Sequence, residues 1–210
     1  MSHDFLLLIL SSPSGAGKTT LTRMLQEKYP ELRFSVSHTT RSPRSNEIDG
    51  RDYHFVDRRR FTELVAEGAF VEWAEVHGNL YGTSLGEIER ARATVGCRGM
   101  IFDIDFQGAR QIRAKVHDAI GVFILPPSME ELEKRLRGRK SDSEETIQRR
   151  FLAAKREIDH YALFDYVIVN DNLASAFEHM SAIVLAERSR RARRAHLAEA
   201  LLRNVPDLHL

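Results

Sequence analysis

The chain has 210 residues, of which 42% are hydrophobic, enough for one folded domain with a real core and too many for wholesale disorder. Its formal net charge of +1 excludes a nucleic-acid binder held by bulk charge, and its single cysteine, Cys97, excludes an internal disulfide. No apolar run reaches the length of a membrane span, so we expect a cytoplasmic protein with no membrane or nucleic-acid partner.

The first predicted elements are a buried strand over residues 5–10, a glycine-rich turn and a helix. The helical spacing of Leu21, Met24 and Leu25 places the helix directly after the turn. A strand, a glycine-rich turn, Gly-Lys-Thr and a helix, in this order, indicate a phosphate-binding P-loop rather than a chance turn. The predicted loop comprises Ser12, Pro13, Ser14, Gly15, Ala16, Gly17, Lys18, Thr19 and Thr20.

The residue types of this loop suit a polyphosphate. Successive backbone N–H groups can surround phosphate oxygens, and the N-terminus of the following helix adds a favourable dipole. Lys18 would supply positive charge to the outer phosphates, and the Thr19 hydroxyl would ligate Mg²⁺. The consensus opens with glycine where this chain has Ser12, so we expect an ordinary φ at that position.

Short elements follow the first helix. One helix is predicted to begin after Asp57, and strict alternation in a strand over residues 70–76 places Phe70 on the same side as Glu72. Because short strands and turns dominate residues 38–83, we expect a small mixed-sheet subdomain inserted into an α/β core. A second core strand is predicted over residues 32–38, and the predicted strands of the inserted region cover residues 53–56, 70–76 and 80–83.

The predicted core resumes with a strand over residues 99–105. It ends in Asp103 and Asp105, at the edge where ligands bind in open parallel sheets. Buried strands over 119–125 and 166–169 complete a predicted five-stranded parallel sheet flanked by helices. Helices are predicted after Ser84, from about Gly108 to Val116, after Ser128, over residues 143–161 and from Leu173 onward.

Two arginine-rich stretches lie in the second half of the chain. Arg135 and Arg139 share one face of a predicted helix, and Arg150 follows across the polar residues 138–145, which we expect to form a mobile loop. The five arginines of residues 188–194 are interpreted as a solvated helix face rather than as a contact with nucleic acid or membrane.

The order of these motifs resembles that of the guanylate kinase family, which belongs to the nucleoside monophosphate kinases. The resemblance extends from the P-loop to about Asp171 and is far more specific than the P-loop alone. It depends on Phe34-Ser35-Val36-Ser37-His38-Thr39-Thr40-Arg41-Ser42-Pro43-Arg44, Gly50-Arg51-Asp52-Tyr53, Phe70-Val71-Glu72-Trp73, Tyr81-Gly82-Thr83, Asp103-Ile104-Asp105 and Val167-Ile168-Val169-Asn170-Asp171.

The resemblance implies ATP-dependent phosphorylation of GMP, and of dGMP, by in-line transfer, with ATP and Mg²⁺ bound at the P-loop. Asn170 would lie near the adenine of ATP, Thr19 would bind Mg²⁺, and Asp103 would bind it through a water. Lys18, Arg41, Arg135, Arg139 and Arg150 would be catalytic. GMP would contact Ser37, Glu72 and Thr83 through its base, Arg41, Arg44, Tyr53 and Tyr81 through its phosphate, and Asp103 and Asp105.

The implied organisation is a single domain with three parts. The P-loop core takes residues 1–37, 84–134 and 151–210, the GMP-binding insertion takes 38–83, and a helical lid takes 135–150. The lid would close and exclude water; its match is partial, because the family often has glycine where this chain has Lys140. Whether the chain forms a homo-oligomer is left open.

The residue types also fit these roles chemically. A carboxylate such as Glu72 can accept hydrogen bonds from both N1–H and the N2 amino group of guanine, whereas adenine presents an acceptor at N1. Two arginines and two phenols suit a dianionic phosphate. Since the accepting phosphate oxygen is already ionised, no strong general base is required, and catalysis should consist of positioning and charge neutralisation.

Three other functions compete with this interpretation. A related phosphotransferase acting on a phosphorylated sugar would need the P-loop but neither Glu72 nor Ser37. A non-catalytic guanylate-kinase-like module that binds partner proteins would have little use for Lys18 and Thr19. A P-loop GTPase would need an Asn-Lys-x-Asp segment to recognise guanine, and the sequence contains none.

Overall fold

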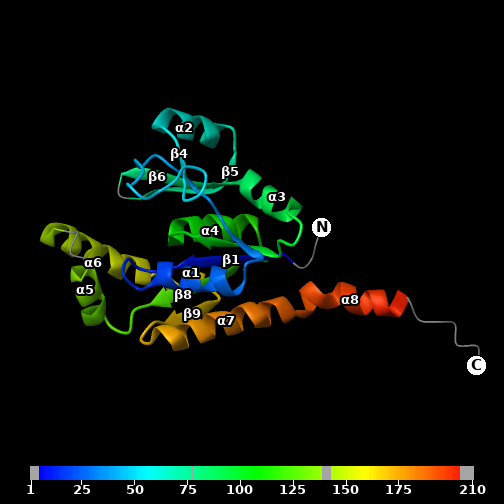
Figure 1. Cartoon of the computed structure of the whole chain (residues 1–210). Helices are drawn as coiled ribbons and strands as arrows, with labels where there is room; N and C mark the ends of the chain where they lie inside the picture. Colours follow the sequence, from blue (N-terminus) through cyan, green and yellow to red (C-terminus); the bar gives the residue numbers. More distant parts are fainter. Residues whose placement is uncertain (1–4, 77, 139–142, 204–210) are drawn as a thin grey trace, which may run out of the picture.

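The computed structural model describes residues 5–76, 78–138 and 143–203, and its core is a five-stranded parallel sheet (Figure 1). The strand order is β2-β7-β1-β8-β9, and each adjacent pair is parallel, which confirms the predicted core. These strands are β1 (Leu6–Ser11), β2 (Leu32–Phe34), β7 (Gly99–Asp103), β8 (Ile120–Leu125) and β9 (Tyr166–Val169).

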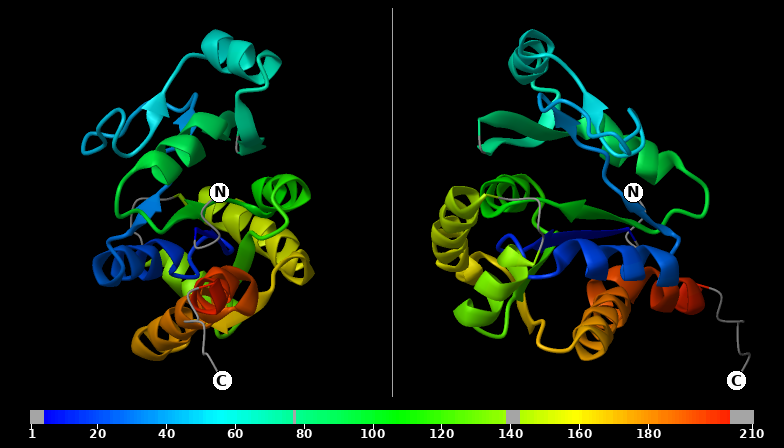
Figure 2. Two further views of the ribbon diagram at one scale, coloured as in Figure 1. Left: turned by 90° about the vertical axis from the view of Figure 1, so that its right-hand side faces the viewer. Right: turned by 60° about the vertical axis from the view of Figure 1, so that its left-hand side comes forward.

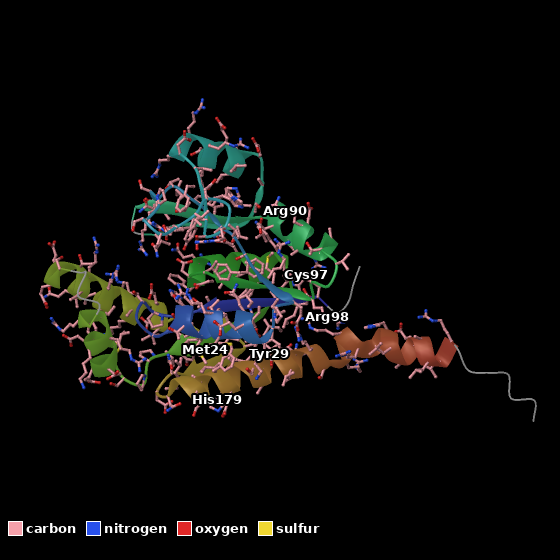
Figure 3. The ribbon with its side chains drawn as sticks, viewed as in Figure 1. Met24, Tyr29, Arg90, Cys97, Arg98 and His179 are labelled. Atoms are coloured by element: carbon pink, nitrogen blue, oxygen red, sulfur yellow. The ribbon has the colours of Figure 1, made fainter. Side chains whose placement is uncertain are left out.

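Helices cover both faces of this sheet, and its central strand β1 is buried throughout and apolar from Leu6 to Leu10. The side chains of Leu6, Leu8 and Leu10 enter the core on the side of α1 and α7, whereas Leu7 and Ile9 enter the core on the side of α3 and α4; Figure 2 shows the two helical layers. Tyr29, labelled in Figure 3, packs where the end of α1 meets α7. The four helices are α1 (Lys18–Lys28), α3 (Leu85–Ala93), α4 (Phe106–Lys115) and α7 (Leu173–Ser189).

A second sheet of four strands lies above the core in Figure 1. Its order is β4-β3-β6-β5; β3 pairs with β4 in parallel, and the other pairs are antiparallel, as expected for a mixed-sheet subdomain. Phe61 of α2 (Arg58–Ala66) packs on this sheet against Phe70 and Leu80. The strands are β3 (His38–Thr39), β4 (His54–Phe55), β5 (Phe70–Val76) and β6 (Asn79–Ser84).

The prediction of one strand over residues 32–38 is wrong, because this segment serves both sheets. β2 ends at Phe34, and the N–H of Ser35 still donates to Ile101 O of β7 at 2.9 Å. Two residues later, Ser37 O accepts from the N–H of His54 at 2.9 Å and belongs to the second sheet. Polarity alternates across the crossing as it would within one strand, so the sequence pattern does not reveal the change of sheet.

The strict alternation predicted for β5 is also wrong at its start. The pairing of β5 with β6 shifts register between Phe70 and Glu72, which marks a bulge. Phe70 consequently stacks on Phe61 under α2, while Val71 enters the core beside α4 and Glu72 faces the cavity described below. The bulge therefore places Phe70 and Glu72 on opposite faces of the small sheet.

The predicted helix starts at Asp57, Ser84 and Ser128 are confirmed, since each side chain accepts a backbone N–H three residues onward. The last of these caps begins α5 (Met129–Arg137). The helix predicted to reach residue 161 is α6 (Glu144–Ile158), followed by a short 3₁₀ turn at Tyr161–Leu163. Residues 139–142 of the predicted mobile loop, Lys140 among them, lie outside the described residues, whereas Glu144 and Glu145 belong to α6.

The chain ends in two helices rather than one, because α8 (Arg191–Arg203) follows a break at Arg190. Of the five arginines around this break, Arg190, Arg191 and Arg194 are exposed as predicted, but the other two are not solvated. Arg188 pairs with Glu31 at 2.7 Å, and Arg193, only 5% exposed, donates to Phe5 O at 2.9 Å. The earlier interpretation is therefore wrong for these two side chains. In the part of the chain that the structure describes, no helix is long and apolar enough to cross a membrane.

Candidate active site

A cavity of about 420 Å³ separates the carboxyl edge of the core sheet from the small sheet. Side chains from both sheets line it, so the fold brings together segments that are far apart in the sequence. The predicted site residues in its lining are Ser12, Pro13, Ser14, Gly15, Gly17, Lys18, Thr19, Thr20, Ser37, Tyr53, Glu72, Tyr81, Asp103 and Asp105.

The P-loop forms one wall of the cavity through its backbone. Gly15 has φ 95° and Gly17 has φ 98°, a left-handed conformation that glycine adopts without steric cost. The N–H of Ala16 donates to Pro13 O at 3.1 Å and closes the turn. Helix α1 then begins at Lys18, so its free N–H groups face the same cavity, as an anion site requires.

Asn170 lies beneath this loop rather than in the cavity lining. Its side chain is 5% exposed, and Nδ2 donates to Ala16 O at 2.7 Å. A Cβ atom at position 17 would lie 2.2 Å from this Nδ2 atom. Asn170 therefore supports the conformation of the loop, and a direct contact with adenine stays a prediction.

Two carboxylates lie at the adjoining strand end, as predicted. The ammonium of Lys18 forms an ion pair with Asp103 Oδ1. Asp105 is the N-cap of α4, and its Oδ1 accepts from the N–H groups of Gln107 and Gly108 at 3.1 and 3.0 Å. The first carboxylate thus holds the charged group of the P-loop, and the second fixes the start of a helix at the cavity.

Glu157 of α6 also lines the cavity, and the sequence pattern did not predict it. Its Oε2 accepts from the P-loop N–H of Ser14 at 3.3 Å. Burial raises the pKa of this carboxyl, against the opposing effects of the Ser14 N–H and of Lys18. On a long helix rich in charged residues, nothing in the local sequence separates Glu157 from exposed neighbours.

The opposite wall of the cavity contains a polar cluster in which Glu72 and the half-buried Ser37 line the cavity, whereas the fully buried Thr83, also a predicted site residue, lies behind them and does not line it. Glu72 is 3% exposed, and its Oε1 accepts from the N–H of Thr83 at 2.8 Å. The hydroxyl groups of Thr83 and Ser37 are 3.1 Å apart. Burial raises the pKa of Glu72 to about 7, because the hydrogen bonds from Thr83 offset the loss of water only in part.

The predicted phosphate-binding residues lie beside this cluster. The phenol rings of Tyr53 and Tyr81 are 6.1 Å apart, and burial raises the pKa of Tyr53. The Arg41 guanidinium lies 5.4 Å from the Tyr53 ring and donates to both carboxylate oxygens of Glu47, at 2.8 and 3.0 Å. This pairing raises the pKa of Arg41 and lowers that of Glu47.

Arg41 and Arg44 do not line the cavity in this conformation. The backbone N–H of the exposed Arg44 donates to Glu47 Oε2 at 2.8 Å, so one carboxylate organises the whole turn. The sequence pattern did not predict a role for Glu47. Its only local signal is the spacing from the two arginines, and this spacing does not distinguish a carboxylate that accepts from Arg41 Nη2 through both oxygens from three solvated charges.

The lid arginines are placed only in part. Arg135 donates to Glu131 Oε1 at 3.0 Å and to the carbonyl of Asn170 at 3.1 Å, next to the support of the P-loop. Arg150 is half-buried on α6, and neither side chain lines the cavity. Arg139 lies outside the described residues. A role for these arginines in catalysis stays a prediction.

Both the sequence and the fold are similar to known proteins. Residues 6–187 match the family model described as guanylate kinase. The chain is 52% identical over 189 residues to a guanylate kinase of Myxococcus xanthus, covering 90% of each chain. It is 53% identical over 186 residues to one of Aromatoleum aromaticum, covering 89% of this chain and 90% of the other. The solved guanylate kinase of Anaplasma phagocytophilum superposes with a TM-score of 0.76 at 33% identity, covering 96% of both chains.

Proposed function

The chain belongs to the guanylate kinase family, and from this premise we infer how the residues of its cavity act. The enzyme transfers the terminal phosphoryl group of ATP to GMP, which gives ADP and GDP. The main support for assigning roles is Glu72, a buried carboxylate that lines the same cavity as the P-loop lysine, Lys18.

We assign recognition of guanine to Glu72, with Ser37 and Thr83. The carboxylate would accept hydrogen bonds from N1–H and the N2 amino group of guanine, while the Thr83 N–H keeps it in place. A charged acceptor opposite the N1 acceptor of adenine would be repulsive, so the same group would reject AMP. Because these contacts use only the base, we expect dGMP to be accepted as well.

The phosphate of GMP would bind beside Tyr53 and Tyr81 and take the place of Glu47 as partner of Arg41. A guanidinium forms equally good paired hydrogen bonds with a carboxylate and with a phosphate. Glu47 therefore keeps Arg41 oriented before the acceptor binds, and the phosphate has to compete with it. Arg44 lies on the same turn and would add a second positive charge.

ATP would bind with its phosphates in the P-loop, from Ser12 to Thr20. The loop N–H groups face the cavity, and Lys18 would exchange its ion pair with Asp103 for the outer phosphates. The N–H of Ser14, now bonded to Glu157, would become available when phosphate replaces that carboxylate. Asn170 would act indirectly, since it holds the loop through Ala16.

The cavity residues fit Mg²⁺ bound together with ATP. The Thr19 hydroxyl and the carboxylates of Asp103 and Asp105 are the hard oxygen ligands that this ion prefers, and Mg²⁺ usually binds one or two side chains plus phosphate and water. Among the described residues no group of three or more acidic, histidine or cysteine side chains could hold a metal. We propose Thr19 as a direct ligand and Asp103 as a ligand through water; bound there, the ion would neutralise phosphate charge.

The transfer itself requires positioning and charge neutralisation. The attacking oxygen of GMP is ionised at neutral pH, so none of the cavity residues has to remove a proton. Lys18 and Arg41 would stabilise the charge on the transferred group, and we propose that Arg135 and Arg150 reach it when the enzyme closes on both nucleotides. Residues 135–150 would then act as the lid, 38–83 as the acceptor subdomain and the rest as the core.

The competing functions do not account for the residues that line this cavity. A protein-binding module would not need Lys18 and Thr19 beside a buried glutamate, and a sugar-phosphate kinase would not need the cluster of Glu72, Ser37 and Thr83. Activity in the cytoplasm remains our proposal, and its support is the single cysteine of the sequence.

Glu72→Gln tests the assignment of guanine recognition. Glutamine keeps the shape but turns a donor toward an N–H group of guanine, a mismatch of about 1–3 kcal/mol, or roughly ten- to a hundredfold in kcat/KM for GMP. AMP should lose little or improve, and KM for ATP should barely change, because the P-loop lies across the cavity.

The measurement is kcat/KM for GMP and AMP in both proteins at saturating ATP. An equal loss for both acceptors, or no loss for either, would show that Glu72 does not recognise the base. Ala74→Ser is a matched control, because Ala74 follows on the same strand and lines the cavity without a polar group. It should change kcat/KM for GMP less than Glu72→Gln does.

A further inference from the structure

The strand that contains Glu72 lies at the edge of the small sheet. β5 pairs with β6 on one side only, so its other row of backbone N–H and C=O groups lacks a strand partner. Helix α4 lies along this row, between β5 and the core sheet, and makes extensive contact with it (Figures 1 and 2). The edge is therefore closed by a helix of the other subdomain.

Gln111 of α4 takes the place of the missing strand at Trp73. Its Oε1 accepts from the Trp73 N–H at 3.1 Å, and its Nε2 donates to Trp73 O at 2.6 Å. A single side-chain amide thus forms the two hydrogen bonds that a residue of a neighbouring strand would form. Trp73 directly follows Glu72, so this contact fixes the backbone on one side of the carboxylate.

Lys115 fixes the backbone on the other side. Its ammonium donates to Val71 O at 2.7 Å and to Phe70 O at 3.3 Å, the two residues that precede Glu72 at the bulge. A bulge leaves backbone groups outside the regular ladder, and these two carbonyls find their partner in α4. Hydrogen bonds from one helix therefore bracket Glu72.

Gly108 completes this face of α4. It lies three residues before Gln111 and seven before Lys115, a spacing that places all three on one side of a helix. A Cβ atom at Gly108 would lie 2.7 Å from Glu72 Oε2, so only glycine leaves room for the carboxylate where it now lies. The same helix begins at Asp105, whose carboxylate lines the cavity.

We propose that α4 positions the guanine-recognising carboxylate: Gln111 and Lys115 are positioning residues that fix the backbone around Glu72, and Gly108 makes room for its side chain. This inference rests on the proposed role of Glu72 in binding guanine. Because the anchor belongs to the core, the distance from Glu72 to the P-loop is set by α4 and not by the small sheet alone. A carboxylate held in this way loses less conformational entropy when it binds two N–H groups at once.

Gln111→Met is the central test, since methionine has a similar length and forms neither hydrogen bond. We expect KM for GMP to rise about tenfold, as for the loss of one to two hydrogen bonds, with KM for ATP within about twofold of the native value. The second readout is the ratio of kcat/KM for GMP to that for IMP, which lacks the N2 amino group. This ratio should fall, because a loosely held carboxylate gains less from the second N–H group.

Arg110→Ala, an exposed position on the same helix, is the matched control and should leave both KM values and the ratio unchanged. If Gln111→Met does not fold, Lys115→Met tests the proposal with the same measurements. If neither variant folds, the contacts are needed for folding rather than for positioning Glu72, and the proposal is overturned. An unchanged GMP/IMP ratio, or equal rises in KM for GMP and ATP, would also overturn it. If Glu72→Gln retains native kcat/KM for GMP, the proposed function itself fails, whatever Gln111→Met does.

Discussion

The two walls of the cavity are built in opposite ways. The P-loop wall is a continuous run of residues, Ser12 to Thr20, and it acts mainly through backbone N–H groups held by glycines in left-handed conformations. The opposite wall, which we call the acceptor wall because we propose that it binds GMP, takes Ser37 and Glu72 from separate parts of the chain, with Thr83 behind them, and presents side chains to the cavity. One wall depends on local backbone geometry, and the other depends on packing between distant elements.

The two walls consequently have different effects on the stability of the fold. Glycine adopts the conformations of the loop without strain, so this wall costs little and its charge, Lys18, is neutralised by Asp103. The acceptor wall holds a carboxylate that is 3% exposed, and burial raises its pKa to about 7. Without GMP the acceptor wall therefore lowers the stability of the fold, and substrate binding would restore part of it.

The largest expected effect comes from removing the charge of the P-loop wall. Lys18→Met should lower kcat about 10²–10³-fold, because a positioned charge at the transferred group is lost. The fold should survive, since Lys18 is not in the core and Asp103 keeps access to water. Near-native kcat in a folded variant, measured by phosphotransfer with matched Tm, would contradict a catalytic role.

The backbone dependence of the same wall is tested by Gly17→Ala. Alanine at φ 98° costs roughly 1–2 kcal/mol, and its Cβ would collide with Asn170 Nδ2, which holds Ala16 in place. We expect a lower Tm and a KM for ATP raised more than tenfold. Gly96→Ala is the control, because Gly96 has φ 82° but nothing within 4 Å of the added Cβ; a similar rise in KM there would refute the explanation.

The cost of the acceptor wall is tested by the pH dependence of stability. The pKa of Glu72 is higher in the folded than in the unfolded chain, so its favourable contribution is complete below about pH 4.5 and is lost as pH rises through 7. Without nucleotide, Glu72→Gln should therefore be more stable than the native protein at pH 8, by up to about 3 kcal/mol. Urea unfolding at pH 5 and pH 8 measures this difference.

The difference between the two proteins should shrink at pH 5, where most of the native carboxyl is protonated. A constant difference at both pH values would mean that Glu72 is not desolvated in solution. Saturating GMP should reduce the advantage of the variant at pH 8, because GMP binds the native protein more tightly and stabilises it more.

The smallest expected effect concerns the turn beside the acceptor wall. Glu47→Gln weakens the competitor of the GMP phosphate for Arg41, so KM for GMP should fall about two- to threefold. The measurement is KM for GMP at low and high salt, since screening should reduce the difference. A rise in KM would show instead that Glu47 is needed to orient Arg41.

Those parts of the fold and the site that depend on interactions within about ten residues could be predicted from the sequence. The P-loop could be predicted because its glycines, Lys18 and the following helix are contiguous, and their geometry follows from backbone preferences within ten residues. The helix starts at Asp57, Ser84 and Ser128 were correct because a cap is a hydrogen bond across three residues. The buried strands could be recognised from their apolar runs, since both faces of a parallel sheet are covered.

The contacts between distant residues could not be predicted, because they depend on how the elements pack. Strand pairing determines both the division of residues 32–38 between two sheets and the bulge at Phe70. A short alternating pattern of polar and apolar residues does not indicate which strand it will pair with. The same holds for Glu157 at the P-loop and Gln111 at Trp73, which look like ordinary polar residues on helices. The prediction for Arg193 was wrong for the same reason. A run of charged residues usually indicates exposure to solvent. Arg193 can be buried because the carbonyl of Phe5, from the other end of the chain, accepts its hydrogen bond.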